Sequence, residues 1–269
     1  MSSTPTLPAD VRRALEKIFP GDAAVFTPEE MFVYGADASR RHALPWAVVR
    51  PDNLEQVRAL LALAQEHRLP VLPRGRGTNT VGDCTPVTGG VVVSTARLNR
   101  IKDIDADDFV AVVEPGVVTA DLQAEAAKKR LFYAPDPASV KFSTVGGNVA
   151  TCAGGMRAVK YGVTRDHVLG LTAVLPGGEV VHCGRRTHKN VVGLDLTRLF
   201  CGSEGTLGII TELTVKLLPL PAATATLALA FADVDAALTA AGDVFRAGIL
   251  PTALEFMARE AMAAVAAIS

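Results

Sequence analysis

Two Gly-Gly pairs, separated by six small or apolar residues, lie in the middle of the chain. The stretch 135–155 reads P-D-P-A-S-V-K-F-S-T-V-G-G-N-V-A-T-C-A-G-G. Glycine has no Cβ, so its backbone can approach another surface closely and can adopt a positive φ. The density of Gly, Ser, Thr and Asn therefore predicts backbone N–H groups and small hydroxyls around an anionic, planar ligand. A tight corner between strands would use the same residues, and this stretch alone does not separate the two interpretations.

Two further glycine-rich segments favour the ligand. They are 73–82, P-R-G-R-G-T-N-T-V-G, and 201–210, C-G-S-E-G-T-L-G-I-I. The first does not fit the G-x-G-x-x-G fingerprint, because Thr80 stands at the third glycine position and no helix pattern follows. Such a loop can still bind phosphate through successive N–H groups. Arg74 and Arg76 either add charge to it or are only solvated. Three separate loops of small residues indicate one large ligand contacted from several sides.

The composition and charge exclude some classes of binding partner. The chain has 269 residues and a net charge of -1, which argues against a nucleic-acid surface or a polybasic membrane patch. The apolar run 227–231 is far shorter than the ~20 residues that span a bilayer, and the first residues do not resemble a secretory signal. The four cysteines form no C-x-x-C pair. We therefore expect free thiols in a reducing compartment, and no metal site.

Hydrophobic periodicity predicts a mixed α and β chain. A strand at 47–50, a helix from 53 and a strand at 69–73 form a β-α-β unit, so these two strands should be parallel. Other predicted helices are 9–18, 119–130 and 195–200, and other predicted strands are 91–94, 101–105, 109–114, 169–175, 179–182 and 209–218. Beyond a boundary at 219–221 the pattern predicts strand 224–231, helix 234–247, strand 253–257 and helix 258–269.

Several segments in order resemble the flavoprotein family of glycolate oxidase and D-lactate dehydrogenase, within the vanillyl-alcohol oxidase and p-cresol methylhydroxylase superfamily. Besides the three glycine-rich stretches, the matching segments are 34–39, 160–167 (K-Y-G-V-T-R-D-H), 175–181, 189–200 and 202–212. They extend over nearly the whole chain up to about residue 218. No single one is specific, but their order is.

The resemblance implies an α+β fold of the p-cresol methylhydroxylase type, in which FAD lies between two α+β subdomains. The implied divisions are an N-terminal segment 1–46, an FAD-binding domain 47–221 with subdomains at about 47–105 and 106–221, and the incomplete beginning of an α+β substrate or cap domain at 222–269. Members of the family continue for about two hundred residues past this point, so the resemblance implies a chain truncated at its C-terminus. The cap supplies the family's catalytic and metal-binding residues, so we name neither here.

The resemblance also implies a set of cofactor-binding residues. The loop Arg74, Gly75, Arg76, Gly77, Thr78 and Asn79 would hold the FAD pyrophosphate. The flavin or its phosphates would be lined by Pro137, Ser139 and Thr144, and approached by the backbone of Gly147, Asn148, Gly154 and Gly155. Gly205 and Ile210 would contact the adenosine. Some relatives attach FAD covalently through a histidine in the first loop. Residues 74–82 contain none, so we expect non-covalent FAD.

The implied activity is oxidation of a D-2-hydroxy acid, such as glycolate or D-lactate, to the 2-oxo acid by hydride transfer to flavin N5. A base from outside this chain would take the hydroxyl proton. The alternative is a flavin-binding subunit or fragment that is inactive without a partner chain supplying the cap. A third hypothesis is a sugar-alcohol oxidase of the same superfamily. We expect little activity from the isolated chain. Expected partners are the small acid and either partner subunits or an electron acceptor, with no nucleic acid and no membrane span. The expected location is the cytoplasm, with peripheral membrane association only through partners.

Overall fold

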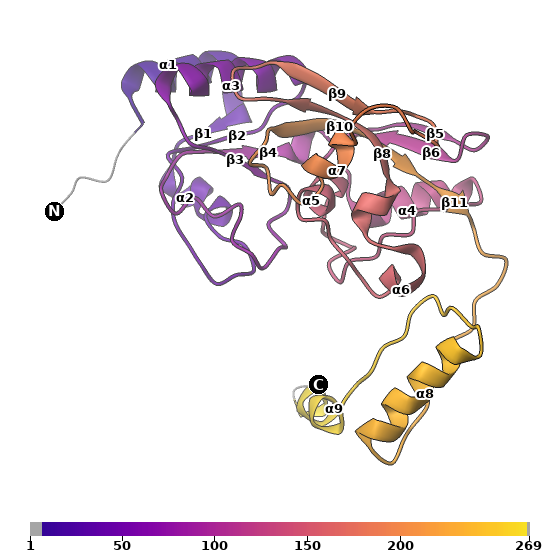
Figure 1. Ribbon diagram of the computed structural model, residues 1–269. Helices are drawn as coiled ribbons and strands as arrows, with labels where there is room; N and C mark the ends of the chain where they lie inside the picture. The colour runs from indigo at the N-terminus through magenta and orange to yellow at the C-terminus, as the bar shows by residue number, and fades with distance from the viewer. Residues whose placement is uncertain (1–6, 268–269) are drawn as a thin grey trace.

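The computed structural model describes residues 7–267, and two β-sheets organise it (Figure 1). The first sheet has the order β1-β2-β4-β3, formed by β1 (Ala24–Val25), β2 (Ala47–Val49), β4 (Val91–Ser94) and β3 (Val71–Arg74). Strands β2 and β3 both run parallel to β4, which lies between them. The predicted parallel orientation is therefore confirmed, with a third strand inserted between the pair.

Two helices cover this sheet, α1 (Ala9–Ile18) and α3 (Leu54–His67). Helix α3 begins where the Asn53 side chain accepts a hydrogen bond from the Gln56 backbone N–H, an N-cap that satisfies one free donor. Its apolar stripe and that of α1 bury Val57, Leu60, Val11 and Leu15 completely. Figure 1 shows the two helices side by side above the sheet.

The second sheet is antiparallel, with the order β5-β6-β10-β8-β9. Its strands are β5 (Ile101–Asp105), β6 (Val110–Val113), β10 (Ile209–Lys216), β8 (Val168–Val174) and β9 (Val180–Gly184). Helix α4 (Thr119–Lys128) packs on it through the buried side chain of Leu122. The predicted hairpin is β8-β9.

The two sheets are packed against each other at one end. Val174 of β8 and Ile209 of β10 belong to the same buried cluster as α1 and α3. The Arg58 side chain of α3 also donates to the Gly178 carbonyl, 3.1 Å away, in the β8-β9 turn. This junction fixes the relative position of the loops that leave β3 and enter β10.

Part of the central glycine-rich stretch is a helix, α5 (Val145–Ala150), where we expected only a loop. Glycine disfavours helix by about 1 kcal/mol per residue relative to alanine. Here the Thr144 hydroxyl caps the helix by accepting from the Gly147 N–H at 3.1 Å. Gly146 is required by packing, because a Cβ there would lie 2.4 Å from Cβ of Pro115. Capping and tertiary packing therefore outweigh the weak helix propensity.

The remaining short elements connect these parts. They are α2 (Pro28–Met31), β7 (Leu131–Phe132), α6 (Ala158–Tyr161), α7 (Leu196–Phe200) and β11 (Leu218–Pro219), together with four short 3-10 turns. Strand β11 pairs with β7 and ends the main body.

The segment after β11 contains α8 (Val234–Arg246) and α9 (Arg259–Ala266), and Figure 1 shows both apart from the sheets. Neither helix buries a residue. The strands that we expected at 224–231 and 253–257 do not form in the described residues. A strand needs a neighbouring strand to satisfy its N–H and C=O groups, and none lies alongside here. No described helix is long and apolar enough to cross a bilayer.

Candidate functional site

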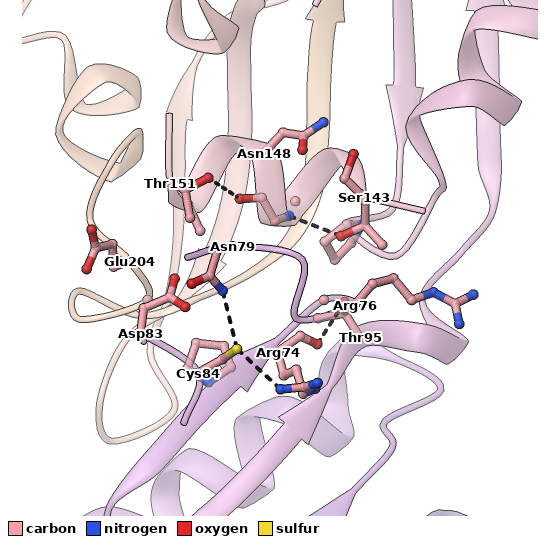
Figure 2. A pocket seen from close by; sticks show the side chains of 18 of the residues that line it. Arg74, Arg76, Asn79, Asp83, Cys84, Thr95, Ser143, Asn148, Thr151 and Glu204 are labelled. Atoms are coloured by element: carbon pink, nitrogen blue, oxygen red, sulfur yellow. Dashed lines mark hydrogen bonds between the residues drawn. The ribbon is translucent and has the colours of Figure 1, made fainter. Parts of the chain in front are cut away.

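A cavity of about 200 Å³ lies where the three glycine-rich segments meet (Figure 2). The loop after β3, the stretch around α5 and the loop before β10 all contribute to its wall. Of the fifteen predicted cofactor-binding residues, thirteen line it: Arg74, Gly75, Arg76, Gly77, Thr78, Asn79, Pro137, Ser139, Thr144, Gly147, Asn148, Gly205 and Ile210. The three loops therefore surround a single space.

The loop after β3 presents unpaired backbone donors. Gly77 has a φ of +65°, a left-handed conformation that glycine adopts without steric cost. Within residues 7–267, no protein acceptor takes the backbone N–H of Arg76, Gly77 or Thr78. Successive backbone N–H groups beside a left-handed residue can form a nest for an anion. The loop thus has the chemistry expected of a phosphate site.

The two arginines of this loop differ sharply. Arg74 is 7% exposed, and its guanidinium donates to the Val33 carbonyl at 3.2 Å and to the Cys84 sulfur at 3.3 Å. No carboxylate in the described part of the chain forms an ion pair with it. Arg76 is exposed, and its side chain points away from the loop in Figure 2. The buried charge of Arg74 therefore faces an anion site, whereas Arg76 is largely solvated.

A buried hydrogen-bond network holds the opposite wall in place. The Thr119 hydroxyl accepts from Asn148 Nδ2 at 2.7 Å and donates to the Ser143 carbonyl at 3.0 Å. Asn148 is 3% exposed. Beside it, a Cβ added to Gly147 would meet only the Thr144 hydroxyl, at 3.1 Å. Hydrogen bonds therefore hold α5 in place, and a ligand can approach its backbone closely at Gly147.

The third wall is the start of β10. This strand pairs with β6 only from Leu213 onward, so residues 209–212 have no partner from β6. On the side away from β8, no described strand covers this part of β10, and Ile210 lines the cavity there. Gly205 has a φ of +77°, and a Cβ there would lie 2.2 Å from Cγ of Pro73. Only glycine allows these two loops to meet.

One end of the cavity is acidic. Burial raises the pKa of Asp83, an effect that hydrogen bonds from Cys84 partly oppose and the negative charges of Glu204 and Asp37 reinforce. Asp37, Asp83 and Cys84 bring potential metal-ligand atoms within 4.8 Å of one another. The Cys84 sulfur already accepts from the Arg74 guanidinium, and a second cation would be repelled by it. We assign no metal to this group.

Two of the predicted residues lie outside the cavity wall. Gly155 is constrained by the chain itself, since a Cβ there would lie 1.8 Å from the Asp136 carbonyl oxygen. Gly154 is exposed, and a Cβ there would make an ordinary contact with Val163 at 3.6 Å.

Sequence reasoning missed other lining residues. They include Asp83, Cys84, Thr95, Pro115, Ser143, Gly146, Thr151, Ser203 and Glu204. Ser143 and Thr151 were visible as small polar residues of the central stretch. Asp83 and Cys84 carry no motif of their own. None of the residues that line this cavity is a histidine.

Comparison with protein families identifies the chemistry of the cavity. The FAD binding domain model matches residues 45–184, which include the first two glycine-rich segments. The model for the C-terminal domain of FAD linked oxidases matches residues 220–269. The residues present fit FAD, because the loop 74–79 has unpaired N–H groups for a pyrophosphate, and the part of β10 that β6 leaves uncovered lies in the same cavity wall.

Two curated relatives are similar over most of this chain. The glycolate oxidase subunit GlcD of Bacillus subtilis (strain 168) is 46% identical over 226 residues, covering 84% of this chain and 48% of that protein. A D-lactate dehydrogenase of Anaerostipes hadrus is 43% identical over 235 residues, covering 87% of this chain and 48% of that protein. The chain thus spans about half the length of the curated relatives that it matches.

Solved structures show the same architecture. An alkyldihydroxyacetonephosphate synthase superposes with a TM-score of 0.80 at 26% identity, over 94% of this chain and 48% of that one. A p-cresol methylhydroxylase with substrate bound superposes with a TM-score of 0.69 at 21% identity. The match covers 81% of this chain and 45% of that one. The expected fold of the p-cresol methylhydroxylase type is confirmed.

Proposed function

The chain belongs to the family of FAD-binding domains, and from that premise we propose that its FAD serves the oxidation of a small D-2-hydroxy acid, such as glycolate or D-lactate, to the 2-oxo acid. The proposal rests on one observation above all. Three glycine-rich segments surround a single cavity, and one of them presents unpaired N–H groups above a buried arginine.

Different residues of the cavity would bind different parts of FAD. We assign the pyrophosphate to the loop 74–79, where the N–H groups of Arg76, Gly77 and Thr78 donate and Arg74 supplies positive charge. The flavin and its ribityl chain would run past Pro137 and Ser139 and across the α5 backbone at Gly147. The adenosine would meet Gly205 and the free edge of β10 at Ile210.

Bound FAD supplies a two-electron acceptor for the hydrogen on the α-carbon of the acid. This chain's contribution is to bind the cofactor, orient it and exclude water from one of its faces. In our proposal, the group that takes the hydroxyl proton comes from outside this chain, as the family resemblance implies. We assign no catalytic residue to residues 7–267.

A second candidate is a flavin-binding subunit that needs another polypeptide to complete its active site. The word "subunit" in the name of the Bacillus subtilis relative supports it. So does α8, whose apolar side chains Val234, Leu238 and Phe245 are all exposed. Unburied apolar faces of this kind favour association. The four free cysteines suit a reducing compartment for either form.

Anaerobic mixing of the FAD-loaded chain with single substrates separates the candidates. Bleaching of the flavin band by glycolate or D-lactate, but not by L-lactate, supports the oxidoreductase working alone. Tight FAD binding without bleaching supports the subunit, and it is the result that we expect from this chain by itself. Bleaching by a sugar alcohol or preferentially by L-lactate would contradict both.

A further inference from the structure

The sulfur of Cys84 joins the two ends of the loop 74–79. At one end, Arg74 Nη1 lies 3.3 Å from Sγ, and at the other end Asn79 Nδ2 lies 3.4 Å from it. Figure 2 shows both contacts converging on the one sulfur atom. Cys84 is 3% exposed, so water does not compete for these donors.

The Asn79 amide is held in the orientation that this contact needs. Its Oδ1 accepts from the backbone N–H of Val81 at 3.0 Å and of Gly82 at 3.2 Å. This assigns the oxygen to the backbone side and leaves Nδ2 to point at the sulfur. Asn79 therefore links the end of the loop both to the turn that follows and to Cys84.

At the other end, Arg74 determines where the middle of the loop lies. A Cβ on Gly77 would be placed 2.3 Å from Arg74 Nη2, so the loop rests directly on the guanidinium. A shift of that guanidinium would move Gly77 and the adjoining N–H groups with it. The position of the anion nest therefore depends on what holds Arg74.

The thiol is well suited to this role. Burial raises the pKa of Cys84, and together with the negative charges of Asp83 and Asp37 it outweighs the attraction of Arg74 for a thiolate. The group therefore stays a neutral acceptor near pH 7, and the charge of Arg74 is not cancelled by its neighbour. Arg74 forms no ion pair with a carboxylate in the described residues, so its charge can serve an anionic ligand.

We propose that Cys84 is a positioning residue for the pyrophosphate of FAD: its sulfur holds Arg74 and Asn79 so that the loop between them keeps the shape of an anion nest. The inference rests on the proposed placement of the pyrophosphate in this loop. Cys84 lies at the edge of the cavity and acts through the loop, whose backbone N–H groups contact the pyrophosphate. Its loss should weaken binding of the phosphate-bearing part of the cofactor and leave binding of the flavin ring unchanged.

The test compares cysteine variants of the chain after removal of flavin. FAD and riboflavin, which lacks the pyrophosphate, are titrated by quenching of flavin fluorescence, and unfolding of each apoprotein is followed on heating. Cys84→Ala should weaken FAD binding roughly tenfold, because the loop loses one or two of the hydrogen bonds that hold it. Riboflavin binding should weaken by less than twofold. Cys84→Ser keeps an acceptor on a shorter bond and should lie between alanine and wild type.

Cys183→Ala is the matched control. Cys183 is 6% exposed and lies on β9, so its truncation leaves a similar void away from the loop. Both alanine variants should lower the unfolding temperature, and only Cys84→Ala should lose FAD affinity. If Cys84→Ala binds FAD like the control, or loses FAD and riboflavin equally, the role of Cys84 is refuted. If the wild-type chain binds no FAD, it is the proposed function that fails.

Discussion

Gly205 lies directly against the ring of Pro73. A Cβ on Gly205 would stand 2.2 Å from Cγ of Pro73, and the residue has a φ of +77°. Pro73 belongs to β3 in the first sheet, and Gly205 precedes β10 in the second. The contact brings two glycine-rich segments from different sheets to the same cavity, and much of the geometry of the site depends on it.

Gly205→Ala should lower the free energy of unfolding by about 2–4 kcal/mol, because it combines a strained positive φ with a clash against a ring. FAD affinity should fall with it, as the two loops are pushed apart. The measurements are urea unfolding and FAD titration.

Gly193→Ala is the control for the cost of placing an alanine at a positive φ. Gly193 has a φ of +79° and nothing within 4 Å of the added Cβ, so only the conformational cost of about 1 kcal/mol applies. Equal losses in the two variants would show that the contact with Pro73 is unimportant.

Arg74 and Arg76 look alike in the sequence but should behave differently on substitution. Arg74→Gln removes a buried charge beneath the nest and should weaken FAD binding by about tenfold or more. Arg76→Gln removes an exposed charge and should change it by less than about threefold. Calorimetric titration with FAD measures both, and a larger effect at Arg76 would contradict the assignment of the buried arginine to the phosphate.

Asp83 should make FAD binding depend on pH. Burial raises its pKa, so the carboxyl takes up a proton at a pH above its usual range as the solution is acidified. Protonation removes a negative charge from a cavity that binds a pyrophosphate, so FAD should bind more tightly as pH falls through this raised pKa.

The variant Asp83→Asn imitates the protonated form. It should bind FAD roughly two- to fivefold more tightly at pH 7, which is the size expected from removing a like-charge repulsion near a surface. The pH dependence of FAD binding should also disappear. The exposed Asp107→Asn serves as control. Weaker binding by Asp83→Asn would indicate instead that the carboxylate accepts from a ribose hydroxyl.

Glu114, at the end of β6, should contribute to stability only above acidic pH. Its burial opposes ionisation, but hydrogen bonds from the Arg100 side chain and backbone outweigh this and lower the pKa. A carboxyl whose pKa is lowered by folding stabilises the protein above its unfolded pKa of about 4.3, and this contribution is lost as pH falls through the folded value.

Glu114→Gln should therefore cost about 1–3 kcal/mol at pH 7, and the difference from wild type should shrink as pH falls below about 4. Urea unfolding at both pH values measures it. Glu125→Gln, at an exposed pair with Lys128, should change stability by less than about 1 kcal/mol. A difference that stays constant with pH would mean that the Glu114 charge is not involved.

Much of the fold could be predicted because the relevant forces are local. The stripe of Val57, Leu60 and Leu61 and the cap at Asn53 define α3 without reference to the rest of the chain. The position of β4 between β2 and β3 is different. It depends on a pairing between segments far apart in the sequence, which no periodicity encodes.

The site was predictable where glycine and small polar residues cluster, and not where tertiary contact decides. Gly147 and Gly155 look equivalent in sequence, but Gly147 lines the cavity and Gly155 makes room for the Asp136 carbonyl. Cys84 is another such case. Its role depends on a loop that folds back on itself to bring the sulfur to Arg74 and Asn79.

The visible absorption spectrum of the purified chain, recorded before and after acid precipitation, decides whether the cavity binds FAD and whether the bond is covalent. We expect flavin absorbance, present on purification or after addition of FAD. It should move entirely to the supernatant, since residues 74–82 hold no histidine for covalent attachment. A protein that stays colourless after addition of FAD would contradict the assignment of the cavity. Flavin that stays with the precipitate would contradict non-covalent binding.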